Sequence, residues 1–294
     1  MNIVRKIKDV ILYIDSRMPF HIRYYVLFRR VKGRWPRLFF PQDYSDFIFK
    51  DNFWGNHNIH AYLADKLEVR KYVEECGLGN ILIPLLGAWE SASKVDFDSL
   101  PNQFAIKCNH SCGMNIICFD KSKLDIKKTR EKLDKWMHEE HPIFFERHYF
   151  HIKPMIIAEA LIPNNQDGCF PTDYKIHCAA GEPVFIQCCV GRNENSDGKR
   201  LVYDCNWNKL PFVKEGDFYT EDEILRPAKL DYMLEVAKRL SKNLDYCRVD
   251  LYETDNEVLF GEITLTPMGG WLIFFSNSAL EYMGQKIIEG KKKA

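Results

Sequence analysis

Two acidic residues, Asp250 and Glu262, lie in a segment whose pattern predicts a β-hairpin. Apolar and polar residues alternate over 247–252 and again over 260–265, as they do in strands with one buried face. The intervening residues 254–257 (TDNE) have the composition of a turn. If the turn is centred on its third residue, Asp250 and Glu262 lie opposite each other, with their Cβ atoms about 5 Å apart.

Facing carboxylates repel each other unless a cation lies between them. A hard divalent ion such as Mg²⁺, held by carboxylates and a substrate phosphate, would remove that repulsion. In that case, a variant that lacks either carboxylate should be as stable as the wild type, or slightly more stable, when both are measured without the ion. A structural pair tied to Arg248 or to a buried lysine would instead lose stability, and a solvated face with alternating charges is a third interpretation. Arg248 on the same face and a loop farther upstream favour the metal site.

The upstream loop, residues 108–113, joins two predicted strands at 103–107 and 114–119. Lys107 ends the first strand, and the loop contains small and polar residues. A loop of this kind can close over phosphates, because backbone N–H groups and a lysine charge then meet the phosphate oxygens. The loop has a single glycine, Gly113, so an ordinary hairpin loop is the alternative interpretation.

The composition is that of a globular protein, with 294 residues, 46% hydrophobic and 28% charged. No apolar run approaches the roughly 18 residues that a membrane span requires. The apolar stretch at 10–14 is too short for a secretory signal, and no small-residue cleavage site follows it. Ten cysteines then fit a reducing compartment as free thiols, so we expect a cytoplasmic protein.

Charge is unevenly distributed, although the net charge is zero. Residues 1–41 contain ten Lys and Arg but only two Asp, and aromatic and aliphatic residues are interleaved with them. Such an arm can lie on an anionic membrane or bind membrane-bound assembly machinery. It can also pack on the domain and leave its basic face in water. Nucleic acid is the third possible partner of a basic segment, and we do not expect it here.

The remaining pattern predicts an α+β chain in which antiparallel hairpins alternate with helices. We expect a basic amphipathic arm over 1–44 and a catalytic domain over 45–290, with subdomains at about 60–155 and 156–285. The connection from Pro36 to Trp54 should be irregular. The main predicted elements are a helix at 61–77, strands at 81–87 and 156–159, a hairpin of strands 174–179 and 183–190 turning at Gly181, and a helix at 229–243.

The order of these features resembles that of the ATP-grasp ligases. Asp65 and Lys66 in a helix, Lys107 before a glycine-containing loop, and the pair at 250 and 262 are the main points of similarity. More narrowly, several strings resemble the TupA-like ATP-grasp family, which is associated with teichuronopeptide and other surface polysaccharide synthesis. The similarity spans about residues 45–285. Its strings are KCNHSCGMN at 107–115, DYK at 173–175, YD at 203–204 with WN at 207–208, RVDLY at 248–252, and GEIT at 261–264 with Pro267.

This resemblance implies an ATP-grasp fold, in which two α+β subdomains grip ATP between antiparallel sheets. It assigns Lys66 and Lys107 to the phosphates of ATP. The other implied ATP-binding residues are a loop over the β- and γ-phosphates (Asn109, His110, Ser111, Gly113), an acidic residue and backbone groups beside adenine (Glu159, Ala160, Ile162), and groups near the ribose and phosphates (Asp173, Lys175).

The resemblance also implies that Asp250 and Glu262 are ligands of Mg²⁺. Arg248 corresponds to an arginine that, together with Lys107, acts on the reacting phosphoryl group. Thr264 stands where many ATP-grasp enzymes have Asn. Its hydroxyl can bind a metal directly or through water, so the sequence leaves open whether one or two Mg²⁺ ions bind.

The implied reaction converts a carboxylate into an acyl phosphate with ATP, after which an amine displaces phosphate to give an amide. The carboxylate would belong to a surface polysaccharide or its precursor, as a uronic acid or an amino acid. A glycosyltransferase of capsule, teichuronopeptide or O-antigen synthesis is the alternative, but the chain lacks a short Asp-x-Asp motif in a parallel-sheet pattern. A non-catalytic nucleotide-binding partner is disfavoured by the two lysines and two carboxylates. The expected location is the cytoplasm, with peripheral contact at the inner face of the plasma membrane.

Overall fold

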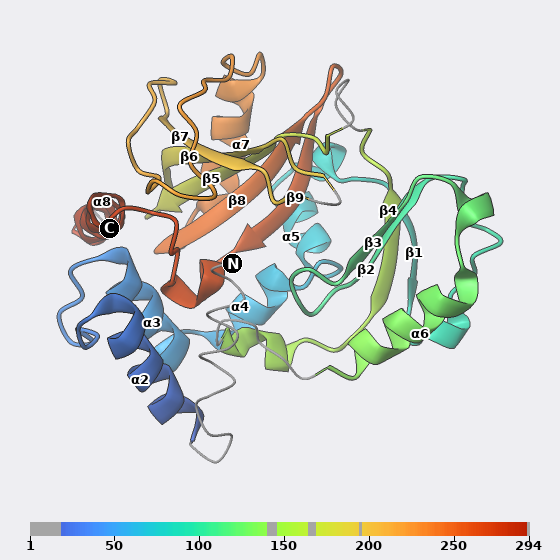
Figure 1. The fold of residues 1–294 in the computed structure, drawn as a ribbon, viewed down its shortest axis with the longest axis horizontal. Coiled ribbons are helices and arrows are strands. Elements are labelled where there is room, and N and C mark those ends of the chain that lie inside the picture. Colours follow the sequence, from blue (N-terminus) through green and yellow to red (C-terminus); the bar gives the residue numbers. More distant parts are fainter. Residues whose placement is uncertain (1–18, 140–145, 164–168, 194–195, 293–294) are drawn as a thin grey trace.

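The fold consists of two antiparallel sheets with helices around them, which confirms the expected α+β class (Figure 1). The computed structural model describes residues 19–139, 146–163, 169–193 and 196–292. None of the helices in these ranges combines the length and apolar character that crossing a bilayer requires. The short 3₁₀ helices are η1 (Gly79–Ile81), η2 (Ala92–Lys94), η3 (Lys121–Lys123), η5 (Arg147–His151) and η6 (Pro267–Gly270).

The smaller sheet has four strands, and alternation along them separates a core face from a polar face. Phe104 and Ile106 of β2 are fully buried against α6 (Ile126–Met137), whereas Ala105 and Lys107 point to the opposite face. In β4, Ala158 lies in the same core. The strands, in spatial order, are β1 (Leu85–Trp89), β4 (Ile156–Ala160), β2 (Phe104–Cys108) and β3 (Asn115–Cys118).

The larger sheet has five strands and is covered on one face by α7 (Leu230–Ser241). The other face is partly covered by α8 (Asn277–Lys291), which also packs on the N-terminal helices. The part of this second face that α8 leaves uncovered carries polar side chains. The strands, in spatial order, are β7 (Lys199–Asp204), β6 (Glu182–Val190), β5 (Asp173–Ala179), β8 (Tyr246–Glu253) and β9 (Val258–Thr264).

Both predicted hairpins are confirmed. β5 and β6 turn at Ala180 and Gly181, whose φ angles of 49° and 80° suit a tight hairpin. In β8 and β9, Asp250 lies opposite Glu262 as expected. The register then shifts, because Gly261 is an extra residue in β9, and a Cβ atom there would lie only 3.0 Å from the Asp250 carbonyl oxygen.

The predicted helix at 61–77 is wrong as a single element, because the chain forms α4 (His57–Ala64) and then α5 (Val69–Glu75). The Asp65 carboxylate accepts hydrogen bonds from the backbone N–H groups of Leu67 and Glu68, which stabilises a turn between the helices. Lys66 therefore lies in a turn. The strand predicted at 81–87 is displaced in the same way, since η1 occupies its start and β1 begins only at Leu85.

The N-terminal region from residue 19 onward is part of the folded domain. α2 (Phe20–Lys32) packs on α3 (Tyr44–Trp54), so the connection expected to be irregular from Pro36 to Trp54 contains a helix instead. Tyr24 is fully buried, and its hydroxyl donates to the Gly269 carbonyl oxygen at 2.6 Å. For these residues the packed-arm interpretation is correct, whereas residues 1–18 of the proposed arm lie outside the described part of the chain.

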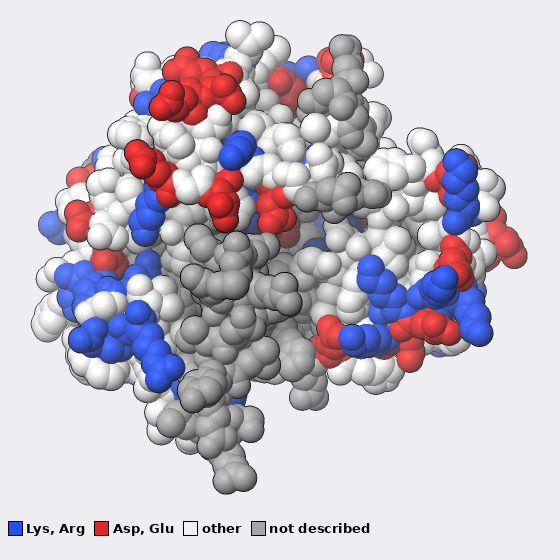
Figure 2. Space-filling view, viewed as in Figure 1, with Lys and Arg blue, Asp and Glu red and all other residues white. Residues whose placement is uncertain are grey.

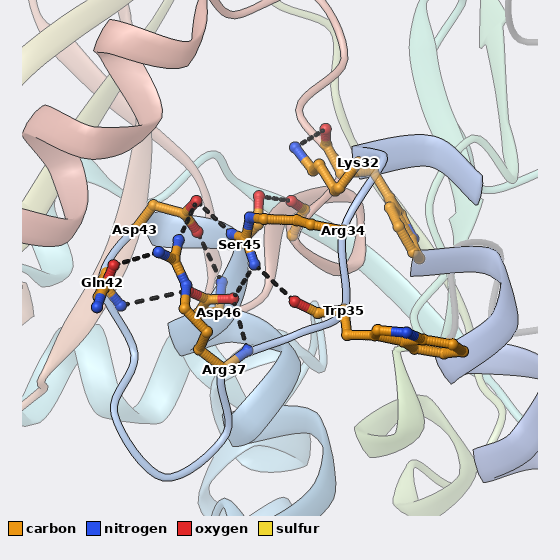
Figure 3. A network of polar contacts seen from close by, with 10 residues as sticks. Lys32, Arg34, Trp35, Arg37, Gln42, Asp43, Ser45 and Asp46 are labelled. Atoms are coloured by element: carbon orange, nitrogen blue, oxygen red, sulfur yellow. Dashed lines mark hydrogen bonds and ion pairs between the residues drawn. The ribbon is translucent and has the colours of Figure 1, made fainter. Parts of the chain in front are cut away.

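A network of ion pairs holds the connection between α2 and α3 (Figure 3). Arg34 and Arg37 each contact both Asp43 and Asp46. The Asp46 side chain is completely buried, and Asp43 caps α3 by accepting from the Asp46 backbone N–H. These four charged side chains therefore stabilise the local structure of the connection.

Two elements near the C-terminal end, β7 and α8, were not predicted. The placement of β4 also bears on the expected division of the domain. Since β4 pairs with β1 and β2, a boundary between residues 155 and 156 would separate β4 from the sheet to which it belongs.

Candidate active site

The polar faces of the two sheets line one cleft of about 420 Å³, which is within the range of small-ligand sites. Residues of β2, β3 and β4 form one wall, and residues of β5, β8 and β9 form the other. Another hollow of about 490 Å³ lies beside α4 and η5, but none of the site residues predicted from the sequence lines it. Most of the site residues predicted from the sequence line the cleft between the sheets instead.

The wall from the larger sheet carries a row of charged groups across three neighbouring strands. Lys175 of β5 lies opposite Asp250 of β8, which in turn lies opposite Glu262 of β9. The ammonium group of Lys175 forms ion pairs with Asp250 and, at 2.6 Å, with Asp173. Burial opposes the charge of Lys175, but these two carboxylates outweigh burial and raise its pKa.

Arg248 joins the two facing carboxylates. Its Nε and one terminal nitrogen donate to the Asp250 carboxylate at 2.6 and 2.7 Å, and the same terminal nitrogen donates to Glu262 Oε1 at 2.8 Å. Thr264 lies 3.1 Å from both that nitrogen and Glu262. The expected repulsion is thus already relieved by a guanidinium group, which matches the interpretation in which the pair is tied to Arg248 and to a buried lysine.

The wall from the smaller sheet places a lysine beside an acidic residue. Lys107 Nζ lies 2.5 Å from Glu159 Oε2, and Arg70 of α5 lies 3.1 Å from the other oxygen of Glu159. The second guanidinium nitrogen of Arg70 donates to the Ile83 carbonyl oxygen at 2.9 Å. Ala160 and Ile162, the residues expected beside adenine, also line the cleft.

Two arginines that contact this site were missed at the sequence level. Arg70 follows a turn that the sequence pattern did not reveal, so its helix phase could not be assigned. Arg192, between β6 and β7, lines the cleft and lies 3.4 Å from Asp173. Nothing in its local sequence marks it, because its partner on β5 becomes a neighbour only through sheet pairing.

The loop between β2 and β3 reaches the cleft through Cys112, Gly113 and Met114, and Gly113 adopts a φ of 73°. Lys66 also lines the cleft; its Nζ donates to the Ser111 carbonyl oxygen at 2.5 Å, and burial lowers its pKa. Lys66 therefore joins the α4–α5 turn to the loop.

Two residues of the expected phosphate loop, Asn109 and His110, do not line the cleft. The Asn109 amide donates to Asp65 at 2.9 Å and to the Lys153 carbonyl at 3.0 Å, and its oxygen accepts from the Met155 N–H at 2.7 Å. These bonds use both amide hydrogens and the amide oxygen of the side chain. His110 is buried outside the cleft lining, and burial lowers the pKa of its imidazole.

The donor set of the cleft suits Mg²⁺ together with phosphate. Mg²⁺ is usually bound by one or two carboxylates and by substrate phosphates. Asp250 and Glu262 offer such oxygens, and the Glu262 side chain is 37% exposed, so it can accept a further ligand. Across the described ranges, no cluster of three or more His, Cys, Asp or Glu residues forms a metal site.

The two sheets meet at a cleft whose walls each carry basic and acidic side chains. A family model described as TupA-like ATP-grasp matches residues 50–288. The chain belongs to the TupA-like ATP-grasp family, as the sequence resemblance indicated. It is accordingly an enzyme of the class that joins carboxylates to amines at the expense of ATP.

Solved structures of other ligases resemble this chain at low sequence identity. The D-alanine–D-alanine ligase from Bacillus anthracis complexed with ATP is 15% identical, with a TM-score of 0.45, over 79% of this chain and 67% of that chain. The D-cycloserine synthetase DcsG is 10% identical, with a TM-score of 0.45, over 98% of this chain and 93% of that chain. Comparison with curated proteins gave no match.

We expect Lys66→Ala and Lys107→Ala each to raise the dissociation constant of Mg·ATP about 10- to 100-fold, because a charge-assisted phosphate contact contributes about 1.5–3 kcal/mol. Isothermal calorimetry measures the change. Lys153→Ala is the matched control, since Lys153 pairs with Glu90 at the surface and does not line the cleft. Unchanged affinity in both cleft variants would contradict the assignment.

Proposed function

We propose that this chain uses ATP to activate a carboxylate of a surface polysaccharide or its precursor and joins it to an amino acid or another amine. The observation that carries the proposal is the composition of the cleft. Lys66 and Lys107 line it together with Asp250 and Glu262, and Arg248 is fixed between the two carboxylates. The link to polysaccharide rests on the association of the family with surface polysaccharide synthesis.

The residues of the cleft can serve phosphoryl transfer, which depends mainly on positioning and charge neutralisation. Lys66 and Lys107 would hold the phosphates of ATP. Mg²⁺, when bound by Asp250 and Glu262, would neutralise further phosphate charge. Arg248, fixed by Asp250, would stabilise the charge on the transferred phosphoryl group. The carboxylate oxygen attacks the γ-phosphorus to give an acyl phosphate and ADP, and an amine then displaces phosphate.

The test is to incubate the purified chain with ATP, Mg²⁺ and a panel of uronic acids and amino acids. We expect ADP and phosphate to form only when a suitable carboxylate is present. Hydroxylamine added in place of the amine should give a hydroxamate, which reports the acyl phosphate directly. ADP formation without any hydroxamate, across the whole panel, would argue against the ligase chemistry.

We also propose that the chain associates peripherally with anionic membranes through the connection between α2 and α3. Phe39 and Phe40 are 81% and 82% exposed, and the Trp54 ring, 58% exposed, lies 6.4 Å from that of Phe39. The ion-pair network shown in Figure 3 holds the same connection, so these rings are presented by ordered backbone. Exposed aromatic side chains of this kind can enter the boundary between head groups and acyl chains.

The charge around these rings fits an anionic lipid surface. In Figure 2, Lys and Arg side chains gather at the lower left, over α2 and α3. In the last turn of α2, Arg29 and Arg30 are exposed basic residues. Basic residues near a membrane surface each contribute about 1 kcal/mol of attraction to anionic lipids, and this attraction weakens with salt.

We expect the double substitution Phe39→Ser/Phe40→Ser to reduce binding to phosphatidylserine-containing vesicles at least about 10-fold, because burying one Phe contributes about 1.5–3 kcal/mol. Co-sedimentation at low and high salt measures the change. Phe150→Ser is the matched control, because Phe150 is an exposed phenylalanine on η5. Deleting the whole arm is unsuitable, since Tyr24 and Phe28 are core residues. Equal co-sedimentation of the wild type and the double variant with the vesicles would contradict the proposal.

A further inference from the structure

The hollow beside α4 and η5 is a second space of ligand size to which the chemistry above assigns no role. Its volume of about 490 Å³ is within the range of small-ligand sites. We call it the α4–η5 hollow. α4 contributes Asn58 and Tyr62 to its lining, the turn after α4 contributes Asp65, and the segment from η5 to β4 contributes His151 and Met155.

Asp65 is the polar group of this lining that calls for a ligand. It is only 7% exposed. Its Oδ1 accepts from the backbone N–H groups of Leu67 and Glu68, at 2.8 and 3.3 Å, and from the Asn109 amide at 2.9 Å. Its Oδ2 has no hydrogen-bond or ion-pair partner among the described residues. A buried carboxylate oxygen needs a donor, and a ligand in the hollow can supply it.

The charges around the hollow favour a ligand without net charge. Glu90 pairs with Lys153 at 2.7 Å, and Glu68 pairs with Lys71 at 2.6 Å. These pairs neutralise one another and leave the carboxylate of Asp65, which repels anions and accepts hydrogen bonds. No group of three or more metal-ligating side chains occurs here or elsewhere in the described ranges. Hydroxyl groups are donors that carry no net charge, so they suit the free oxygen of Asp65.

The other lining residues suit a sugar. A sugar ring has hydroxyl groups at its edge and C–H groups on its faces, so it binds where polar side chains and flat apolar surfaces meet. Tyr62 provides an aromatic ring, and the ring of His151 is held by stacking on His57 at 6.0 Å and 7°. Met155 adds apolar surface, and the amide of Asn58 can both donate and accept. Small-ligand pockets commonly combine apolar surface with a few polar groups in this way.

We propose that the α4–η5 hollow binds uncharged sugar residues of the acceptor, whose hydroxyl groups donate to Asp65, while the carboxylate to be activated lies in the cleft. This inference rests on the proposed function. Asp65 lines the hollow, and the next residue, Lys66, lines the cleft. Consecutive Cα atoms are about 3.8 Å apart, so the two spaces adjoin at one turn. Binding of the sugar residues in the hollow positions the carboxylate for attack on ATP.

The first test measures sugar binding without ATP, by calorimetry, with a panel of neutral trisaccharides of glucose, galactose and N-acetylglucosamine. We expect Asp65→Asn to weaken binding about 10-fold or more, because a hydrogen bond to a charged group is lost. Asn keeps an oxygen for the N–H groups of Leu67 and Glu68 and places an NH₂ group where Oδ2 accepted. Asp231→Asn is the matched control, because Asp231 is an exposed residue of α7 that lines neither space.

A second variant, Tyr62→Leu, leaves the turn intact. It should also weaken sugar binding about 10-fold, since it removes the aromatic ring but keeps apolar contact with the core. The dissociation constant of Mg·ATP is measured on both variants. If Asp65→Asn weakens ATP binding as much as sugar binding, Asp65 acts through the turn that carries Lys66, and the proposal is overturned.

The kinetic test compares a uronic acid alone with the same acid linked to a neutral disaccharide. The linked acid should have a KM about 10-fold lower in the wild type, and this advantage should disappear in Asp65→Asn. Unchanged sugar binding in both variants, or binding of free amino acids in place of sugars, would contradict the proposal. The two levels of inference are separable. Hydroxamate formation without sugar binding contradicts only the role of the hollow, whereas Asp65-dependent sugar binding without any hydroxamate supports that role and contradicts the ligase function.

Discussion

Glu262→Gln and Asp250→Asn should both reduce ATP-dependent ligation about 1,000-fold or more, yet they should differ in stability. Each variant removes a carboxylate that the site offers to Mg²⁺·ATP, which explains the shared loss. Glu262 is partly exposed, so its loss should change the free energy of unfolding by less than about 1 kcal/mol. Asp250 is 2% exposed and pairs with both Arg248 and Lys175, so its loss should destabilise the fold by about 3–5 kcal/mol.

Two quantities are measured on both variants. Hydroxamate formation with ATP and Mg²⁺ reports activity, and urea unfolding in the absence of Mg²⁺ reports stability. The sequence alone led to a different expectation, that loss of either carboxylate would leave stability equal or slightly higher. The structure corrects this for Asp250, because two protein cations depend on it. A Glu262→Gln variant with near wild-type turnover would show that Glu262 is not a metal ligand. An Asp250→Asn variant as stable as the wild type would contradict the stabilising role of the Asp250 ion pairs.

The alternation of β8 and β9 was enough to predict the central part of the site. A period of two fixes which side chains share a face, so the sequence pattern alone groups Arg248, Asp250 and Glu262. The row continues through Lys175 on β5, and this could not be predicted. β5 and β8 are about 75 residues apart, and no local pattern specifies which strand pairs with which.

The errors in the fold have local causes. Apolar spacing continues from α4 into α5, so periodicity alone gave one helix, whereas the Asp65 side chain stabilises a turn within it. The start of α3 could have been recognised. Asp43 is a good N-cap residue, and the acidic Asp46 in the first turn is a second helix-start signal. The aromatic residues of that segment hid the signal, since they pack on α2 and do not form a simple amphipathic stripe.

The occupied side chain of Asn109 shows a different limit. A polar residue in a loop beside a lysine is a reasonable phosphate ligand by type, and the sequence could not show that Asp65, Lys153 and Met155 satisfy its amide. Hydrogen-bond partners depend on tertiary contacts, so residue type alone assigns a role only when the partners are known.

Arg248→Ala should abolish ligation and make the stability of the chain depend on Mg²⁺. Arg248 is the group that contacts both facing carboxylates, so its removal should destabilise the fold by about 3–5 kcal/mol without divalent ions. Asp250 and Glu262 would then repel each other, and Mg²⁺ could bind between them in the absence of ATP. At a concentration about 100 times its dissociation constant, the ion would restore about 2.7 kcal/mol.

Thermal unfolding with and without Mg²⁺, at constant ionic strength, measures this response. The melting temperature of Arg248→Ala should rise with Mg²⁺ by several degrees more than that of the wild type. Arg192→Ala is the matched control, because Arg192 contacts Asp173 and leaves the Asp250–Glu262 pair intact. Ligation should stay lost in Arg248→Ala even when Mg²⁺ restores its stability, since the charge on the transferred phosphoryl group then lacks its arginine. Equal responses of the three proteins to Mg²⁺ would show that the facing carboxylates do not form a metal site by themselves.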